Sequence, residues 1–252
     1  MSGFNAHAIL GELCMSKIFT TPGFHIGFVK PDYMHVCCLG ILQYLLGNVM
    51  WELFLTVGGV YSRPKEACAT LLNMTKLFAK RLGLEPPFNA LTIRMIKPQA
   101  SKRPRMALKA AEGRYFLPVL TKMLADAFPP DSALAQVRLD CCKALCRCYY
   151  ELRNWMALEP PARLEKAGRQ HLLLYKELHN NAGADSRYWH MYPKHHLFIH
   201  VCDVQVNPAA LWNYSDEDEI GRAARLARRC HEGSIQRALI ERYRVQFDFA
   251  TD

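Results

Sequence analysis

Long apolar or amphipathic runs alternate along the chain with short segments that contain proline or glycine. The longest run, residues 36–57 (VCCLGILQYLLGNVMWELFLTV), ends before Gly58-Gly59 and is typical of a helix buried on all sides. A short strand is predicted over residues 23–29, and residues 195–206 fit helix or strand. Hydrophobic periodicity predicts further helices over residues 65–82, 106–127, 133–157, 162–180, 216–231 and 234–247.

The helix predicted over residues 65–82 is amphipathic. Gly83 is expected at its C′ position, because glycine adopts a left-handed backbone at little cost. Its packing face is predicted to consist of Ala69, Leu72, Leu77 and Phe78.

The apolar run over residues 36–57 is long enough to cross a bilayer. It contains Gln43, Asn48 and Glu52, however, and each of these polar side chains is costly in lipid. The pattern favours a buried core helix over a membrane span, so no membrane partner is expected. A helical membrane-associated protein is the less favoured alternative.

Composition gives the net charge of the chain and indicates a compartment. The 252 residues are 50% hydrophobic, enough to bury a core as one large domain or two small ones. The net charge of +9 favours an anionic partner, with nucleic acid the commonest and an acidic membrane the alternative, although a basic protein without such a partner stays open. No signal peptide is visible in residues 1–17. A reducing, intracellular compartment fits the cysteines predicted to be buried free thiols, namely Cys37, Cys38, Cys141, Cys142, Cys146 and Cys148.

Two pairs of residues are candidates for metal chemistry. Asp32 and His35 lie where the strand gives way to the apolar helix, a common place for a metal ion, although an N-cap aspartate beside a partly buried histidine explains the same pattern. His196 and His200 have the four-residue spacing of a metal pair. Hydrogen-bonded imidazoles in a polar core are the favoured interpretation of this second pair.

Two basic segments are candidates for phosphate contact. The first has no acid between residues 94 and 105, and the second forms one stripe of a predicted helix, for which a solvated face is an equally good explanation. The candidates are Arg94, Lys97, Lys102, Arg103 and Arg105 in the first segment and Arg222, Arg225 and Arg229 in the second.

The order of four motifs resembles the C-terminal part of DDE-type, ribonuclease-H-like transposase-derived proteins of the protist kind. These proteins are distantly similar to the CACTA, hAT and Kyakuja-Dileera-Zisupton transposases. The motifs are DYMHVCCLG from residue 32, KAAEGRYFLP from residue 109, PKHHLFIH from residue 193 and WNYSDEDEIG from residue 212. Their order is more specific than any one of them, and together they cover roughly residues 25–245.

The resemblance implies a mainly α chain with a partial ribonuclease-H-like remnant of few short strands. Residues 1–35 would be the catalytic-core remnant, 36–190 a helical insertion, and 191–252 core helices with a late acidic motif. In such families two aspartates and a late glutamate hold Mg²⁺. The resemblance assigns catalytic roles to Asp32, His35, Glu217 and Glu219, with Asp32 and Glu217 as the metal ligands.

Two departures from the family pattern bear on activity. The first catalytic aspartate has no counterpart in this chain, and Asp218 stands where relatives carry phenylalanine. Residues 216–219 are also explained as acids of a helix N-terminus capped by Ser215.

The hypothesis is therefore a nuclear, DNA-associated, transposase-derived protein, open to homo-oligomer formation. Its ancestral reaction is Mg²⁺-dependent DNA strand cleavage and transfer, and this chain is expected to be inactive. The alternative is a non-catalytic helical binding or scaffold module.

Overall fold

The computed structural model describes residues 22, 31–58, 63–97, 103–155, 162–183, 188–204 and 206–211, together with positions 224, 227, 228, 232–235, 237 and 241. The chain divides into two compact units, Met1–Pro31 and Asp32–Asp252, and nearly all described residues belong to the second. The strand predicted over residues 23–29 lies outside the described residues, as do most of the last two predicted helices. The three-part division of the chain stays a prediction.

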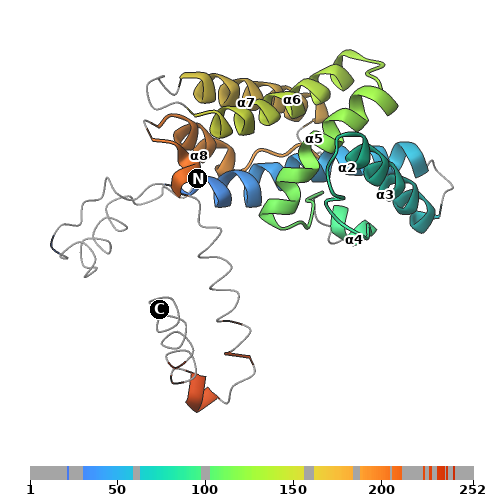
Figure 1. Ribbon diagram of the computed structural model, residues 1–252. Coiled ribbons are helices and arrows are strands. Elements are labelled where there is room, and N and C mark those ends of the chain that lie inside the picture. Colours follow the sequence, from blue (N-terminus) through green and yellow to red (C-terminus); the bar gives the residue numbers. More distant parts are fainter. Residues whose placement is uncertain are drawn as a thin grey trace. The chain divides into compact units, whose positions relative to one another are not determined.

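Helices form the described part of the second unit (Figure 1), and no strand occurs among its described residues. The mainly α fold class is therefore confirmed, and the segment that begins at residue 195 is helical. The short strands of a ribonuclease-H-like remnant are not found in the described part. In chain order the elements are the π-helix η3 (Met34–Ile41), α2 (Leu42–Gly58), α3 (Pro64–Arg81), α4 (Ile93–Ile96), α5 (Ala110–Ala127), α6 (Ala133–Arg153), α7 (Ala162–Ala182), α8 (Pro193–Cys202), and the 3₁₀ turns η4 (Pro208–Leu211) and η5 (Glu232–Ser234).

The apolar run forms η3 and α2, which lie in the core. α2 packs against η3, α3, α4 and α5, while α6 and α7 lie side by side, α6 against α5 and α7 against α8 (Figure 1). Among the described residues one helix, Met34–Gly58, is long and apolar enough to cross a membrane, and 78% of its most apolar stretch is buried. The burial predicted for this run is confirmed.

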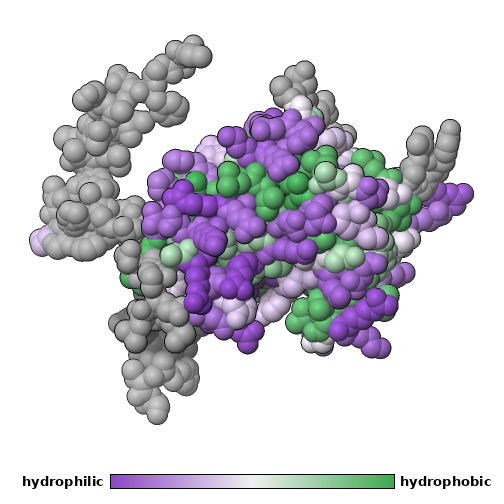
Figure 2. Space-filling model, turned by 90° about the horizontal axis from the view of Figure 1, so that it is seen from above, coloured by the Kyte–Doolittle hydropathy of each residue, from purple (hydrophilic) through white to green (hydrophobic). Residues whose placement is uncertain are grey.

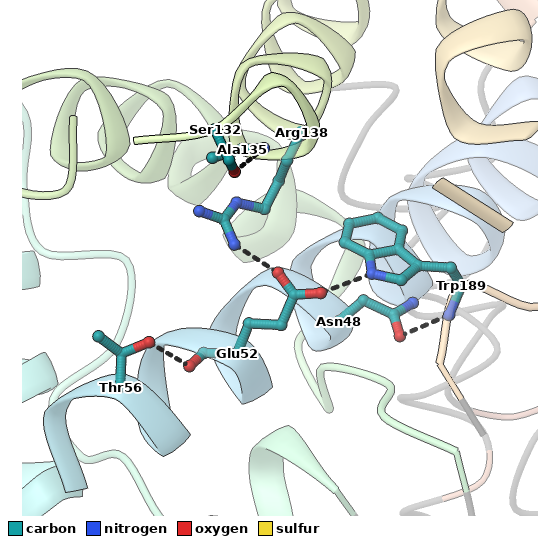
Figure 3. A network of polar contacts seen from close by, with 7 residues as sticks. All are labelled: Asn48, Glu52, Thr56, Ser132, Ala135, Arg138 and Trp189. Carbon is teal, nitrogen blue, oxygen red and sulfur yellow. Dashed lines mark hydrogen bonds and ion pairs between the residues drawn. The ribbon is translucent and has the colours of Figure 1, made fainter. Parts of the chain in front are cut away.

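Polar side chains on α2 bind segments that are distant in the sequence. The Asn48 side-chain oxygen accepts the backbone N–H of Trp189 at 3.0 Å, and the Glu52 carboxylate accepts the indole N–H of the same residue at 2.6 Å (Figure 3). The other Glu52 oxygen lies 2.5 Å from an Arg138 nitrogen on α6. Gln43 likewise binds residues 105–108. Each polar residue of the apolar run therefore has a partner inside the protein.

The packing face predicted for α3 is wrong for two of its four residues. Phe78 is buried and Leu72 half-buried, but Ala69 and Leu77 are exposed. A threonine belongs to the true face: Thr75 is buried because its hydroxyl donates to the helix backbone at 2.8 Å. The buried residues of α3 are Ala67, Cys68, Leu71, Thr75, Phe78 and Ala79.

Of two helix boundaries predicted from the sequence, one agrees with the structure and the other does not. Gly83 follows α3 with φ of +66°, as predicted for a C′ glycine. α5 begins at Ala110, whereas a helix was predicted from residue 106. The difference arises because residues 105–107 bond to other segments, with Met106 N donating to Gln43 O at 2.8 Å.

The described cysteines are free thiols, and burial decides their chemistry. Burial raises the pKa of Cys146 to about 11 and raises the pKa of Cys141 well above its usual value. Such thiols stay protonated near neutral pH, whereas thiolates bind metals and react. The structure confirms the predicted burial of Cys37, Cys38, Cys141, Cys142 and Cys148. Cys146 is only partly buried.

Hydrophilic side chains cover most of the face in Figure 2, and apolar residues form smaller patches among them. The exposed large apolar side chains come from several helices and include Leu55, Leu77, Tyr115, Tyr150 and Leu173. Scattered apolar residues of this kind are normal on protein surfaces.

Candidate nucleic-acid interface

The loop that follows α4 lies on α2 and brings predicted basic residues onto aromatic rings. Lys97 Nζ lies 4.6 Å from the ring centroid of Trp51, and Arg105 Cζ lies 5.6 Å from that of Tyr44. The two aromatic residues are seven positions apart and therefore share a face of α2. Cations at this distance from a ring are attracted to its face, so the contacts position both basic side chains.

The segment before α8 extends this arrangement. The rings of Tyr192 and Tyr44 stack with centroids 3.9 Å apart, and Arg103 Cζ lies 5.8 Å from the Tyr192 ring. His190 packs edge-on against the same ring at 5.0 Å. Burial lowers the pKa of His190, and the neighbouring positive charges of Arg103 and His179 lower it further. Positive charge is therefore concentrated at this edge of α2.

A glutamine and a glycine of α2 hold the basic loop. The Gln43 side chain accepts from Arg105 Nε at 2.8 Å and donates to Leu108 O at 2.7 Å. A Cβ atom on Gly47 would lie 2.5 Å from both the Cα and the N of Arg105. The loop backbone can therefore reach α2 only because residue 47 has no side chain.

Lys194, on α8, contributes a fourth cation. Its Nζ donates to His35 O at 2.8 Å and lies 3.5 Å from Leu39 O, which Arg105 Nη2 also approaches to 3.5 Å. These carbonyls belong to the π-helix η3, in which Gly40 departs from helical geometry with φ −122° and ψ −105°. Burial lowers the pKa of Lys194, and the charge of Arg105 lowers it further.

The four cations define what we call the basic surface. Within the described residues none of them forms an ion pair with a carboxylate, so no described carboxylate neutralises their charge. Arg94 is exposed on α4, while Lys102, Arg222, Arg225 and Arg229 lie outside the described residues. The basic surface consists of Lys97, Arg103, Arg105 and Lys194.

The Asp32–His35 pair lies at the start of η3, next to the basic surface. Asp32 Oδ2 accepts the backbone N–H of His35 at 2.9 Å and lies 2.6 Å from His35 Nδ1. The hydrogen bond from the His35 backbone N–H is that of an N-cap, so the N-cap interpretation of Asp32 is confirmed. Its other oxygen, Oδ1, is buried and has no hydrogen-bond partner among the described residues.

The described residues do not by themselves fit Mg²⁺. This ion takes a near-octahedral set of oxygen ligands, and the described chain supplies only the Asp32 carboxylate here. No group of three or more histidine, cysteine, aspartate or glutamate side chains that could hold a metal occurs in the described part. Glu217 and Glu219 lie outside it, and their approach to Asp32 stays a prediction.

The histidines of α8 that face the core are not the ones predicted to do so. His196 and His200 are exposed, with their Nε2 atoms 3.2 Å apart, so a polar-core role is wrong for this pair. The buried histidines are His195 on α8 and His171 on α7, and burial lowers the pKa of each to about 4. The helix-or-strand ambiguity of this segment hid which of three nearby histidines faces the core.

The basic loop was predicted from charge alone, whereas Lys194 was missed. The sequence gives only a weak signal for Lys194, because a single lysine beside a proline does not predict a basic surface. Lys194 joins the surface because α8 packs on η3. The transposase resemblance stays a prediction, since no protein-family model, curated protein or solved structure matches this chain.

Proposed function

We propose that this chain is a non-catalytic helical module that binds DNA through phosphate contacts at the basic surface. The observation that carries the proposal is the gathering of four cations from the 97–105 loop and α8 without a carboxylate partner in the described part. Such a concentration of positive charge attracts a polyanion. DNA is the polyanion named because of the resemblance to transposase-derived proteins.

The contacts around the aromatic residues favour phosphate over base recognition. Tyr44 and Tyr192 stack on each other, and basic side chains lie near both rings. Trp51 stacks on Phe54 and faces Lys97. Because the faces of these rings are already occupied, the described aromatic residues of the basic surface offer bases no free platform on which to stack. Binding is therefore expected to depend little on sequence and to be no tighter for single strands than for duplex.

The test is fluorescence anisotropy of a labelled DNA duplex titrated with the full chain at several salt concentrations. The triple variant Lys97→Gln, Arg103→Gln, Arg105→Gln is expected to bind about tenfold more weakly at low salt. The slope of log affinity against log salt should become shallower by about 0.9 for each phosphate that the variant no longer neutralises.

A matched control removes the same charge elsewhere. Lys65, Lys80 and Arg81 are exposed on α3, and Arg81 lies 4.9 Å from the ring centroid of Phe78, so their replacement by glutamine also removes one cation–aromatic interaction. Equal weakening by both triple variants would mean that net charge, not the basic surface, drives binding. A wild-type chain that does not bind DNA at low salt would refute the proposal and leave the scaffold alternative.

A further inference from the structure

The exposed face of α8 carries a second constellation, independent of the basic surface. His196 and His200 are one helical turn apart, and their Nε2 atoms approach to 3.2 Å with the ring planes at 81°. Both side chains are exposed, whereas the opposite face of α8 is anchored in the core by His195, Phe198 and Val201. A firmly packed helix therefore presents two imidazole nitrogens at short range.

The separation of the two nitrogens matches the bite of one metal ion. Zn–N bonds of about 2.0–2.1 Å at a tetrahedral angle place two ligand nitrogens about 3.3–3.4 Å apart. The observed 3.2 Å lies within about 0.2 Å of that value. The contact is a hydrogen bond between the two Nε2 atoms, so the bridging proton must leave before both lone pairs can bind a shared cation.

We propose that His196 and His200 bind one divalent transition-metal ion of the Zn²⁺ class. Neutral imidazole is a ligand that suits zinc, copper and nickel, whereas Mg²⁺ and Ca²⁺ prefer oxygen. The two nitrogens occupy two tetrahedral positions, and water fills the other two. The ion spans one turn of α8 and keeps coordination positions open to an exchangeable ligand.

The test titrates Zn²⁺ alone into the metal-free full chain by isothermal calorimetry. His196→Gln and His200→Gln are each expected to weaken the binding of one Zn²⁺ per chain by at least about tenfold, since removal of even an outer-shell partner commonly has that effect. The comparison must be between variants, because the chain contains ten histidines and ten cysteines in all.

A matched control keeps the number of histidines constant. The double variant Leu197→His, His200→Gln replaces the four-residue spacing with neighbouring positions, which do not face each other on a helix. Leu197 is already exposed, so the change leaves the core untouched. This variant should lose the same affinity as His200→Gln.

A second measurement needs no variant. Histidine ring ¹⁵N spectra of the wild-type chain should show the Nε2 resonances of His196 and His200 shifting together on addition of one equivalent of Zn²⁺. Unchanged affinity in His200→Gln, full affinity in the double variant, or ring resonances that do not shift would each overturn the proposal.

Discussion

Two buried histidines make the fold sensitive to mild acid. His171 Nδ1 lies 3.0 Å from Cys141 O, and His195 Nδ1 lies 3.0 Å from the N and 3.2 Å from the O of Tyr192. The Nε2 atom of each is buried without a hydrogen-bond partner in the described part. Protonation would place a positive charge in the core, where burial disfavours the charged form and no described residue accepts a hydrogen bond from Nε2.

The size of the effect follows from the lowered pKa values. A histidine with a pKa of about 4 in the folded state, against about 6.5 when unfolded, binds its proton more weakly in the fold. The unfolded chain therefore takes up protons first as the pH falls. Stability is full above about pH 6.5 and falls by up to about 1.4 kcal/mol per pH unit for each histidine until about pH 4. The full decrease for one histidine is about 3 kcal/mol, and the two are not additive because the charge of His171 further lowers the pKa of His195.

Urea unfolding followed by circular dichroism between pH 7.5 and 5 measures this slope before most carboxylates titrate. His171→Gln and His195→Gln should each be less stable at pH 7.5, yet lose less stability on acidification than the wild type. His200→Gln, on the exposed face of α8, serves as the control. Stability that is constant from pH 7.5 to 5, or a slope that neither buried variant reduces, would refute the assignment.

Two further predictions concern the loop and catalysis. Gly47→Ala should lower the free energy of unfolding by about 1–3 kcal/mol and weaken DNA binding, because the new Cβ meets the Arg105 backbone. Gly113→Ala should spare DNA binding in the same anisotropy assay, because the nearest atoms that its Cβ would meet outside α5 are side-chain atoms of Leu42 and Leu46, at 3.3 Å or more. Equal weakening by both variants would count against the role of the loop. By its resemblance to transposase-derived proteins, the chain should not nick supercoiled plasmid with Mg²⁺ or Mn²⁺. It has no counterpart of the first catalytic aspartate of that family pattern, and loss of one metal ligand commonly abolishes nearly all activity. Cleavage that Asp32→Ala abolishes would show a working site.

Local signals predicted the helices and part of the candidate site. Apolar periodicity located α2, α6 and α7, and the absence of acids marked the basic loop. Periodicity did not identify the buried face of α3, because Thr75 satisfies its hydroxyl within the helix and packs like an apolar residue. Nor could it show that Gly47 meets Arg105, a contact made between segments 58 residues apart. Side-chain roles that depend on such contacts have no local signature.

Trp189 illustrates the same limit at a strained position. Its φ of 53° places a bulky residue in the left-handed region, which glycine or asparagine usually occupies. Asn48 holds its backbone N–H and Glu52 holds its indole N–H, so contacts from α2 stabilise a conformation that the local sequence disfavours (Figure 3). Nothing within the 188–192 segment itself predicts this turn.

The polar residues of the apolar helix thus have a second role. In the sequence, Gln43, Asn48 and Glu52 argue against insertion into lipid. In the structure, Gln43 fixes Arg105, while Asn48 and Glu52 fix Trp189. The first attachment holds the loop that carries three of the four cations, and the second fixes the chain just before the residues that carry the fourth. Because both attachments are on the same buried helix, the basic surface depends on the core. A change at any of these three positions should affect stability and DNA binding together, whereas a change of Lys97, whose Nζ lies over the Trp51 ring, should affect mainly binding.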